Sequence, residues 1–292
     1  MEEKKLLIVT GATGGLGKSI SMYFAALAAK DSTLYPIFCC RDKNKAKELE
    51  EYVEPSGLSK DNYAIFLTDL SSSSSVDKLA ARIRFLQLPI KALVNNAGSM
   101  FGSYQTNAEE IEMNMAVNFY GPARLAEMLA SNIAQKGSIV NVVSLTRKFV
   151  DIESDFLKGN PDSYTRVGYY SKSKLALSIF TADMAERYPN IYINGVDPGV
   201  MNTKMLKMDK WFDRLADYIF RPFTLEPSQS LEAIQAACEN KDGVRGSVFT
   251  RKKYFPIEKK IANHPLRQLI QTTICNSVKY ILISQVVSYR KL

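Results

Sequence analysis

Short apolar runs alternate with longer segments of helical periodicity along most of this chain. The runs cover Leu6–Thr10, Leu34–Cys40, Tyr63–Thr68, Ala92–Asn96, Ser138–Ser144 and Ile191–Asp197. Helical segments lie between them, over 16–29, from about 43, over 108–133 and over 170–188. Because strands that are covered on both faces are continuously apolar, this order predicts a parallel sheet between two layers of helices. Right-handed crossovers then give a doubly wound sheet, whose ligands bind at the carboxyl ends of the strands.

The composition favours one globular domain. Of the 292 residues, 46% are apolar and 23% are charged, which is typical of a globular protein rather than a disordered one. No linker or internal repeat interrupts the alternation. We therefore expect a single α/β domain over 1–260 with about seven strands, and a C-terminal helical extension over 261–292.

Cysteine and histidine are too few and too scattered for a metal site. The four cysteines form no CxxC pair, and His264 is the only histidine, so no metal is expected. The thiols are expected to be reduced, and the first ten residues lack the core of a signal peptide. These features predict a cytoplasmic protein, or one on a membrane surface that faces the cytosol.

A glycine turn follows the first strand and opens the first helix. In the segment TGATGGLG (Thr10–Gly17), backbone amides and the helix N-terminus can approach a pyrophosphate without obstruction by side chains. The spacing fits two dinucleotide-binding patterns, because either Gly14 or Gly15 can be the middle glycine. The predicted cofactor contacts in this turn are Thr10, Gly11, Thr13, Gly15, Leu16 and Gly17.

The end of the second strand bears on the choice between NADP and NAD. An arginine at this place receives the 2′-phosphate of NADP, whereas an acid binds the ribose hydroxyls of NAD. Here Arg41 stands first after the strand, and its planar guanidinium suits a phosphate. Asp42 follows and favours NAD. The arrangement predicts NADP(H) as the cofactor, with NAD(H) as the alternative.

A tyrosine and a lysine four residues apart form the candidate catalytic pair. Tyr170 and Lys174 lie on one face of a helix. A free tyrosine has a pKa of about 10, and a nearby ammonium favours the phenolate and lowers that value. Such a tyrosine can act as acid for carbonyl reduction or as base for alcohol oxidation. Ser144, at the end of a buried strand, is placed to bind the substrate oxygen.

Together these features resemble the short-chain dehydrogenase/reductase family, over roughly Lys4 to Ala237. The family's motifs occur in its order, as Thr10–Gly17, Asp69-Leu70, Asn95–Gly98, Asn118 in AVNFYG, Ser144 in IVNVVS, Tyr170 with Lys174, and Pro198-Gly199 with Thr203. The resemblance implies a Rossmann fold and an oxidoreductase that transfers a hydride between NAD(P)(H) and a carbonyl carbon. Tyr169 does not match the motif, because only Tyr170 stands four residues before a lysine.

The resemblance also implies roles for single residues. Asp69 would contact the adenine, and Leu70 would also bind the cofactor. The segment Asn95–Gly98 would lie along the cofactor, with Asn96, Ala97 and Gly98 as the contacts. Asn118 would hold a water that relays protons to Lys174, and Lys174 would bind the nicotinamide ribose. The cofactor contacts expected after the sixth strand are Pro198, Gly199, Val200 and Thr203, the last of them at the carboxamide.

Within the family, the chain is similar to the retinol dehydrogenase and hydroxysteroid dehydrogenase branch. The segments CRDKNKA and RKKYF and the 26-residue interval from Ser144 to Tyr170 carry this similarity. It implies a bulky apolar substrate such as a retinoid or a ketosteroid. The segment Met201–Phe223 is rich in methionine, a side chain that adapts to apolar ligands, and it is the expected substrate lid.

Two other functions remain open at this point. One is an NAD(P)-binding regulatory protein without turnover, although it would not need Asn118, Ser144, Tyr170 and Lys174 together. The other is an epimerase of the extended family, which the Asn95–Gly98 motif and the modest length disfavour.

The net charge of +8 is concentrated near the C-terminus. Residues 243–292 carry ten basic and one acidic side chain, so the rest of the chain is near neutral and no nucleic acid partner is expected. The uncharged stretch Tyr280–Ser288 is shorter than the roughly 20 residues that span a bilayer. Apolar positions from Leu266 to Leu282 can form one helical face, either for an anionic membrane surface or for covering the substrate cleft or a contact in a homo-oligomer.

Overall fold

The computed structural model describes residues 3–199, 227–251 and 253–289, and their strands form one sheet. The strands are β1 (Lys5–Thr10), β2 (Leu34–Cys40), β3 (Ala64–Leu67), β4 (Ile90–Asn95), β5 (Ile133–Val142), β6 (Tyr192–Val196), β7 (Ser247–Thr250) and β8 (Lys253–Pro256). Their spatial order is β3-β2-β1-β4-β5-β6-β7-β8. All neighbouring strands are parallel except β7 and β8. The predicted doubly wound sheet is confirmed, and β8 is added to it as an antiparallel edge strand.

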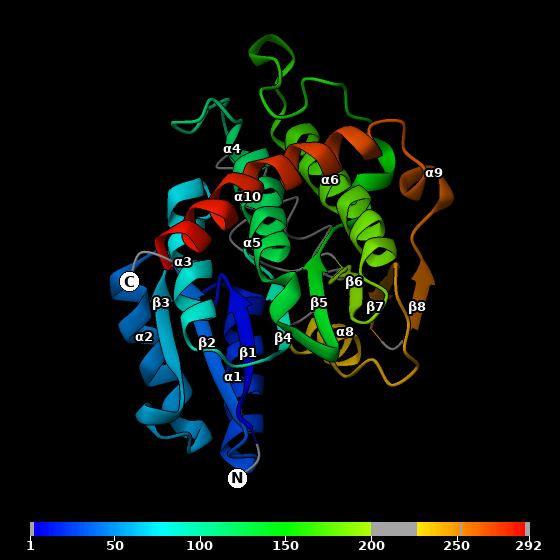
Figure 1. Cartoon of the computed structure of the whole chain (residues 1–292). Coiled ribbons are helices and arrows are strands. Elements are labelled where there is room, and N and C mark those ends of the chain that lie inside the picture. Colours follow the sequence, from blue (N-terminus) through cyan, green and yellow to red (C-terminus); the bar gives the residue numbers. More distant parts are fainter. Residues whose placement is uncertain (1–2, 200–226, 252, 290–292) are drawn as a thin grey trace.

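Helices cover both faces of this sheet (Figure 1). In β1, Leu6 and Ile8 belong to the apolar core on one face, and Leu7 and Val9 to the core on the other, because successive strand side chains point in opposite directions. The second of these cores is completed by α1 (Gly15–Lys30), α2 (Lys43–Val53) and α8 (Pro227–Glu239). The first is completed by α3 (Ser73–Phe85), α5 (Gly121–Leu129) and α6 (Arg166–Arg187).

The segment predicted as one helix over 108–133 is broken in the structure. The short helix α4 (Met113–Met115) passes into a π-helical turn, η3 (Ala116–Tyr120), before α5 begins. β5 already starts at Ile133, which pairs with Ile90 of β4. That prediction was wrong because strand pairing to a distant segment overrides the local helical period. The remaining short elements are η1 (Glu54–Ser56), η2 (Lys60–Asn62), η4 (Ala130–Asn132), η5 (Leu145–Phe149), η6 (Pro161–Ser163) and α9 (Lys259–Ala262).

The C-terminal extension forms a long helix, α10 (Arg267–Tyr289), which lies across α5 and α6 (Figure 1). Its residues Ile270, Ile274 and Val278 are buried in the apolar core. The Arg124 guanidinium of α5 donates a hydrogen bond to the Ser277 carbonyl. The apolar face predicted for the tail therefore packs, over these turns, on the chain's own domain.

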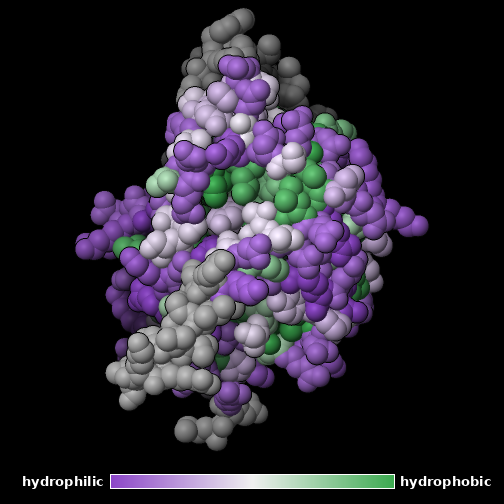
Figure 2. All heavy atoms as spheres, turned by 45° about the horizontal axis from the view of Figure 1, so that its top comes forward, coloured by the Kyte–Doolittle hydropathy of each residue, from purple (hydrophilic) through white to green (hydrophobic). Residues whose placement is uncertain are grey.

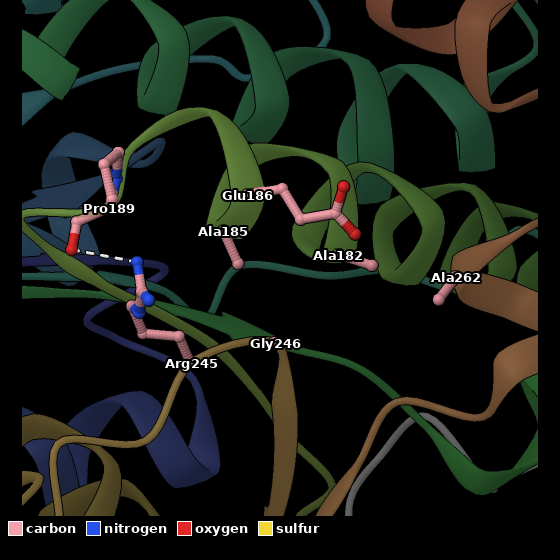
Figure 3. A pocket seen from close by; sticks show the side chains of 7 residues that line it. All are labelled: Ala182, Ala185, Glu186, Pro189, Arg245, Gly246 and Ala262. Carbon is pink, nitrogen blue, oxygen red and sulfur yellow. Dashed lines mark hydrogen bonds between the residues drawn. The ribbon is translucent and has the colours of Figure 1, made fainter.

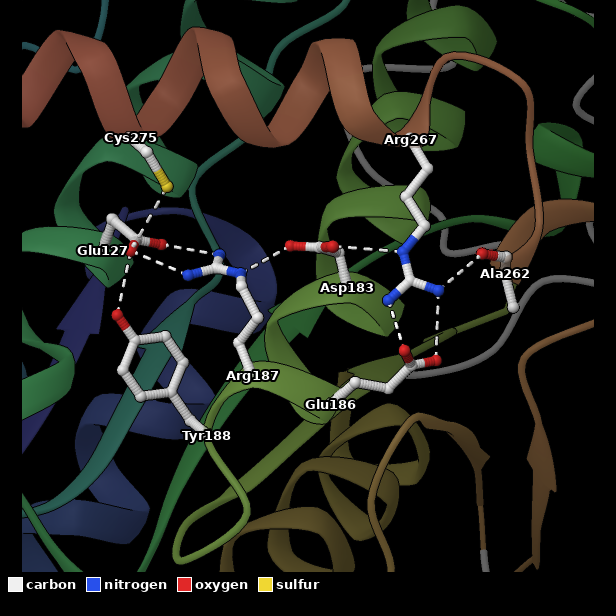
Figure 4. A network of polar contacts seen from close by, with 8 residues as sticks. All are labelled: Glu127, Asp183, Glu186, Arg187, Tyr188, Ala262, Arg267 and Cys275. Carbon is white, nitrogen blue, oxygen red and sulfur yellow. Dashed lines mark hydrogen bonds and ion pairs between the residues drawn. The ribbon is translucent and has the colours of Figure 1, made fainter.

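A network of ion pairs joins α5, α6 and α10 (Figure 4). The Glu127 carboxylate of α5 accepts two hydrogen bonds from Arg187 of α6, both at 2.9 Å. At the start of α10, Arg267 donates to Asp183 and Glu186 of α6. These contacts hold α10 along α6, the helix that carries Tyr170 and Lys174.

Most of the face in Figure 2 is hydrophilic, with hydrophobic side chains gathered in a few patches. Among the residues described, no helix is both long and apolar enough to cross a membrane. An open groove of about 450 Å³ lies beside the C-terminal half of α6, where Arg245 donates to the Pro189 carbonyl (Figure 3). This groove adjoins the amino ends of β6 and β7, the edge opposite to that where ligands of such sheets bind.

Candidate active site

The glycine turn joins the carboxyl ends of β1 and β4. Gly11 has a φ of +65°, a left-handed conformation that glycine adopts without strain. The Asn96 side-chain amide donates to the carbonyls of Thr10 (2.9 Å) and Gly11 (3.2 Å). The Thr10 hydroxyl accepts the N–H groups of Asn96 and Ala97, both at 3.1 Å. A Cβ on Gly17 would lie only 2.0 Å from the Gly11 carbonyl oxygen, so the helix approaches the turn as closely as backbone allows.

The start of α1 leaves room for an anion. Gly14 and Gly15 are exposed at the helix N-terminus, with Thr13 partly buried before them and Leu16 buried behind them. The first N–H groups of a helix lack partners within it and attract phosphate. The turn therefore fits the pyrophosphate of a dinucleotide.

Arg41 and Asp42 have different surroundings at the end of β2. Asp42 is the N-cap of α2, where its carboxylate accepts the N–H groups of Asn44 (2.7 Å) and Lys45 (3.1 Å). These hydrogen bonds lower the pKa of Asp42. Arg41 is exposed directly after the strand. The carboxylate is thus already used in capping, whereas the guanidinium faces solvent at the edge where ligands bind.

Asp69 and Leu70 follow β3 at the same edge, beside β2. The Asp69 carboxylate accepts the backbone N–H (2.9 Å) and the hydroxyl (2.7 Å) of Ser71. Leu70 is buried, and its carbonyl oxygen lies 2.2 Å from where a Cβ on Gly121 would stand. These contacts fix the loop after β3 against the start of α5.

Asn118 lies fully buried in the π-helical turn η3. Its amide oxygen accepts the Ser99 N–H at 2.8 Å, and its amide nitrogen donates to the Ser99 carbonyl (2.8 Å) and the Ser173 hydroxyl (3.0 Å). A Cβ on Gly98 would lie 3.4 Å from both the Asn118 oxygen and the Lys174 Nζ. Asn118, Gly98 and Lys174 therefore meet at one point, and turns of this kind are frequent at functional sites.

The Ser144 side chain acts on the Tyr170 hydroxyl, and hydrogen bonding by Ser144 lowers the Tyr170 pKa. The net pKa of Tyr170 is raised to about 12, mainly by burial and in smaller part by the negative charge of Asp197, while hydrogen bonding by Ser144 acts in the opposite direction. The sequence predicted that Lys174 lowers this pKa; in the structure the net direction is upward, because desolvation outweighs the favourable contacts. At neutral pH the phenol is therefore protonated and can donate a hydrogen.

Lys174 lies beneath this pair and is 2% exposed. Its Nζ donates to the Val142 carbonyl at 2.7 Å and stands 5.8 Å from the centre of the Tyr170 ring. Burial lowers the pKa of Lys174 to about 8, although the charge of Asp197 acts in the opposite direction. The structure thus brings Asn118, Ser144, Tyr170 and Lys174 together from three segments of the chain, the last two residues both lying on α6.

The side chains of Tyr169 and Asn95, which are neighbours of predicted site residues, bind other parts of the chain. The Tyr169 hydroxyl binds the backbone of Asn160, accepting its N–H at 2.5 Å and donating to its carbonyl at 3.0 Å. The Asn95 amide donates to Asn141 (2.9 Å) and to the Pro122 carbonyl (3.3 Å). The Asn95 side chain therefore lies in the interior, whereas the resemblance placed Asn95–Gly98 along the cofactor.

Asp197 and Arg147 are charged groups that sequence reasoning missed. Asp197 follows β6 directly, and its carboxylate accepts the Gly199 N–H at 3.0 Å, which shapes the turn at Pro198. Arg147 is buried beside it in η5. The available signal was an acid between a buried strand and a Pro-Gly turn. The predicted contacts Val200 and Thr203, and the predicted lid over 201–223, lie outside the described residues.

Comparison with known proteins identifies the family. The family model described as short chain dehydrogenase matches residues 5–211. The chain belongs to the short-chain dehydrogenases. Human polyprenol dehydrogenase is 28% identical over 222 residues, which cover 73% of this chain and 65% of that protein. Human retinol dehydrogenase 13 is 30% identical over 205 residues, which cover 69% and 60%.

The match spans less than two thirds of the length of these relatives. Solved structures confirm the fold of this short-chain dehydrogenase. A short-chain dehydrogenase/reductase from Brucella melitensis superposes with a TM-score of 0.65 at 21% identity, covering 85% of this chain and 95% of that one. An actinorhodin polyketide ketoreductase solved with NADPH gives 0.63 at 20% identity, covering 89% and 98%.

The matched family model and these relatives are named dehydrogenases. The relatives named retinol dehydrogenase confirm the predicted resemblance to that branch. The residues present fit the cofactor, because Gly14 and Gly15 are exposed at the N-terminus of α1 and no side chain caps that end of the helix.

Proposed function

We propose that this short-chain dehydrogenase reduces a ketone or aldehyde with NADPH, or oxidises the matching alcohol with NADP, and that its substrate is bulky and apolar. The observation that carries the proposal is the meeting of Ser144, Tyr170 and Lys174 at the carboxyl edge of the sheet. A binding protein without turnover has no need of this arrangement. An extended-family epimerase is disfavoured, because the family model and the similar relatives are those of dehydrogenases.

Each catalytic side chain has a distinct task in the proposed reaction. The bound dinucleotide supplies the hydride. The Ser144 hydroxyl donates to the carbonyl oxygen of the substrate, and Tyr170, neutral at pH 7, transfers its proton to that oxygen as negative charge develops. The ammonium of Lys174 then stabilises the phenolate. Asn118 fixes the backbone at Ser99 and the Ser173 hydroxyl beside this path.

Arg41 supports NADP as the cofactor. It is the first residue after β2 and is free of the capping contacts that engage Asp42. A charge-assisted hydrogen bond to a phosphate contributes about 1.5–3 kcal/mol, which corresponds to roughly 10- to 100-fold in affinity. Arg41→Ala should therefore weaken NADPH binding by about that factor and leave NADH binding unchanged. Asp42→Ala, which removes only the cap, is the matched control, and equal effects of both variants on NADPH would contradict the assignment.

Apolar side chains beside the catalytic pair support an apolar substrate. Leu145 follows Ser144 and is 51% exposed, and Phe149, at the end of the same turn, is 77% exposed. Val167, one helical turn before Tyr170, is 51% exposed. Exposed apolar groups of this kind mark ligand-binding surfaces. A methionine-rich lid over 201–223 would complete the site. The alcohols in the names of the relatives, polyprenol and retinol, are likewise apolar molecules.

The tail supports a proposal about location. Since the apolar face of α10 up to Val278 packs on α5 and α6, contact with an anionic membrane would depend on residues 280–292. We propose a cytoplasmic protein that touches membranes through this segment, and a chain ending at Lys279 should sediment less with anionic vesicles than the full chain. Equal sedimentation would exclude the membrane contact, and light scattering of both chains would reveal a homo-oligomer.

The central test is the loss of NADPH oxidation in Tyr170→Phe, with retinaldehydes and ketosteroids as substrates. Removal of a general acid lowers turnover by about 10²- to 10⁴-fold. Tyr169→Phe removes a hydroxyl that binds only the Asn160 backbone, so it should keep nearly full activity. Undiminished turnover in Tyr170→Phe would refute the mechanism.

A further inference from the structure

A buried arginine lies directly behind the catalytic serine. Arg147 is 3% exposed, and its guanidinium donates to the Ser144 carbonyl at 2.8 Å. The same nitrogen lies 3.7 Å from the Asp197 carboxylate, which is itself 9% exposed. On its outer side the guanidinium meets Glu258 at 3.4 Å, and the exposed Lys148 also pairs with Glu258.

Burying the Arg147–Asp197 ion pair costs free energy, which packing alone does not require. Taking two charges out of water is unfavourable, and an apolar pair of similar volume is often as stable. Arg147 and Asp197 are nonetheless both buried at the carboxyl ends of β5 and β6. The pair therefore needs an explanation beyond packing, and its place beside Ser144 indicates one.

The charge of Asp197 reaches both proton-carrying side chains of the site. It raises the pKa of Tyr170 and that of Lys174. The groups that act on the Tyr170 hydroxyl are thus Ser144 and the Asp197 charge, and the Lys174 Nζ stands 5.8 Å from the Tyr170 ring centre. Asp197 faces the Arg147 guanidinium and the Gly199 N–H. Without Arg147, one uncompensated negative charge would stand near a tyrosine that must release a proton.

We propose that Arg147 is a positioning residue for the reaction, which holds the Ser144 backbone in place and balances the Asp197 charge so that Tyr170 can give up its proton. This inference rests on the proposed role of Tyr170. It assigns two tasks to one side chain, a geometric one through the Ser144 carbonyl and an electrostatic one through Asp197, and the two can be separated by mutation.

The electrostatic task predicts the direction of a shift. Loss of the guanidinium leaves Asp197 unbalanced, which favours the protonated forms of both Tyr170 and Lys174. The reduction rate falls as pH rises through the pKa of the group that must remain protonated. This fall is the alkaline limb of the pH profile. Whichever of the two groups sets it, Arg147→Met should move the limb to higher pH by about one unit, because a single neighbouring charge shifts a pKa by at least about that much.

The experiment is the pH profile of kcat/KM for carbonyl reduction in a set of matched variants. Arg147→Met should move the alkaline limb upward by about one unit and lower kcat by about 10-fold. The double variant Arg147→Met/Asp197→Asn should bring the limb back while kcat stays low, because the Ser144 carbonyl still lacks its partner. Arg147→Lys, which restores a cation, should bring the limb back in part. Lys148→Met, which removes the other partner of Glu258, should match the unmodified protein.

An unshifted limb in Arg147→Met overturns the electrostatic task, and an unchanged kcat overturns the geometric one. If Arg147→Met does not fold, as thermal unfolding would show, Asp197→Asn alone decides: its limb should move downward, and an unmoved limb refutes the inference. Tyr170→Phe is measured in the same series. Activity in Tyr170→Phe refutes the proposed function, whereas an inactive Tyr170→Phe with an unshifted Arg147→Met refutes only the role of Arg147.

Discussion

Replacing Glu127 by glutamine measures what the buried part of the α5–α6–α10 ion-pair network contributes to stability (Figure 4). The Glu127 side chain is 8% exposed. Its carboxylate accepts two hydrogen bonds from Arg187 and one from the Tyr188 hydroxyl, each at 2.9 Å, and the Cys275 thiol of α10 also donates to it. Glutamine keeps the volume but turns one acceptor into a donor that faces the Arg187 guanidinium.

The magnitude follows from what remains after the substitution. At least one charge-assisted hydrogen bond is lost, which contributes about 1.5–3 kcal/mol. The Arg187 charge is not left alone, because Asp183 still pairs with it at 2.7 Å, so the cost stays below the roughly 3–5 kcal/mol of a fully broken buried pair. We expect Glu127→Gln to lower the free energy of unfolding by about 2–3 kcal/mol.

The matched control lies in the same network. Glu186 pairs with Arg267, but its side chain is 66% exposed, and exposed ion pairs contribute roughly 0–1 kcal/mol. Urea unfolding followed by circular dichroism gives both free energies, and the dependence on urea concentration should be the same in both variants. Equal losses in Glu127→Gln and Glu186→Gln would show that burial does not govern this network and would refute the reasoning.

Two further predictions concern the cofactor turn and the buried lysine. Gly17→Ala places a Cβ 2.0 Å from the Gly11 carbonyl oxygen, so the glycine turn must shift. A fluorescence titration should show NADPH binding weakened by at least about 100-fold. Gly102→Ala is the control and should bind NADPH normally, because its Cβ meets nothing within 4 Å. Burial lowers the pKa of Lys174 to about 8, so the folded state holds this proton less tightly than the unfolded chain does. The buried ammonium therefore destabilises the fold fully below pH 8, and this destabilisation disappears by about pH 10.5. Lys174→Met should therefore be about 2 kcal/mol more stable than the unmodified protein at pH 7, after loss of the hydrogen bond to Val142. Urea midpoints from pH 7 to 10.5 should show this difference shrinking, and a constant difference would contradict the prediction.

The strands were predictable from sequence because those buried on both faces must be continuously apolar, whatever their neighbours. The helical boundaries between residues 108 and 133 were not. The widened turn at Asn118 depends on contacts with Ser99 and Ser173, and the early start of β5 depends on pairing with β4. Neither partner is local in sequence.

The candidate catalytic residues were predictable because their types and order match a family motif. Their electrostatics were not. The sequence suggested that Lys174 lowers the pKa of Tyr170, but desolvation raises it, and burial is a property of the folded chain. Arg147 and Asp197 stand 50 residues apart, so only the sheet, which places β5 beside β6, reveals that they pair.

The same difference between local pattern and tertiary contact holds at the end of β2, with Arg41 and Asp42, and in the C-terminal tail. By itself, the sequence determined a doubly wound sheet, a glycine turn, the tyrosine–lysine pair and an amphipathic C-terminal helix, because each depends on local spacing. It left open what Asp42 binds and what the helix covers. The tertiary structure places the Asp42 carboxylate on the start of α2 and the apolar face of α10 on α5 and α6. An apolar face is chemically the same toward a membrane, another subunit or its own domain, so only the packed chain could decide between them.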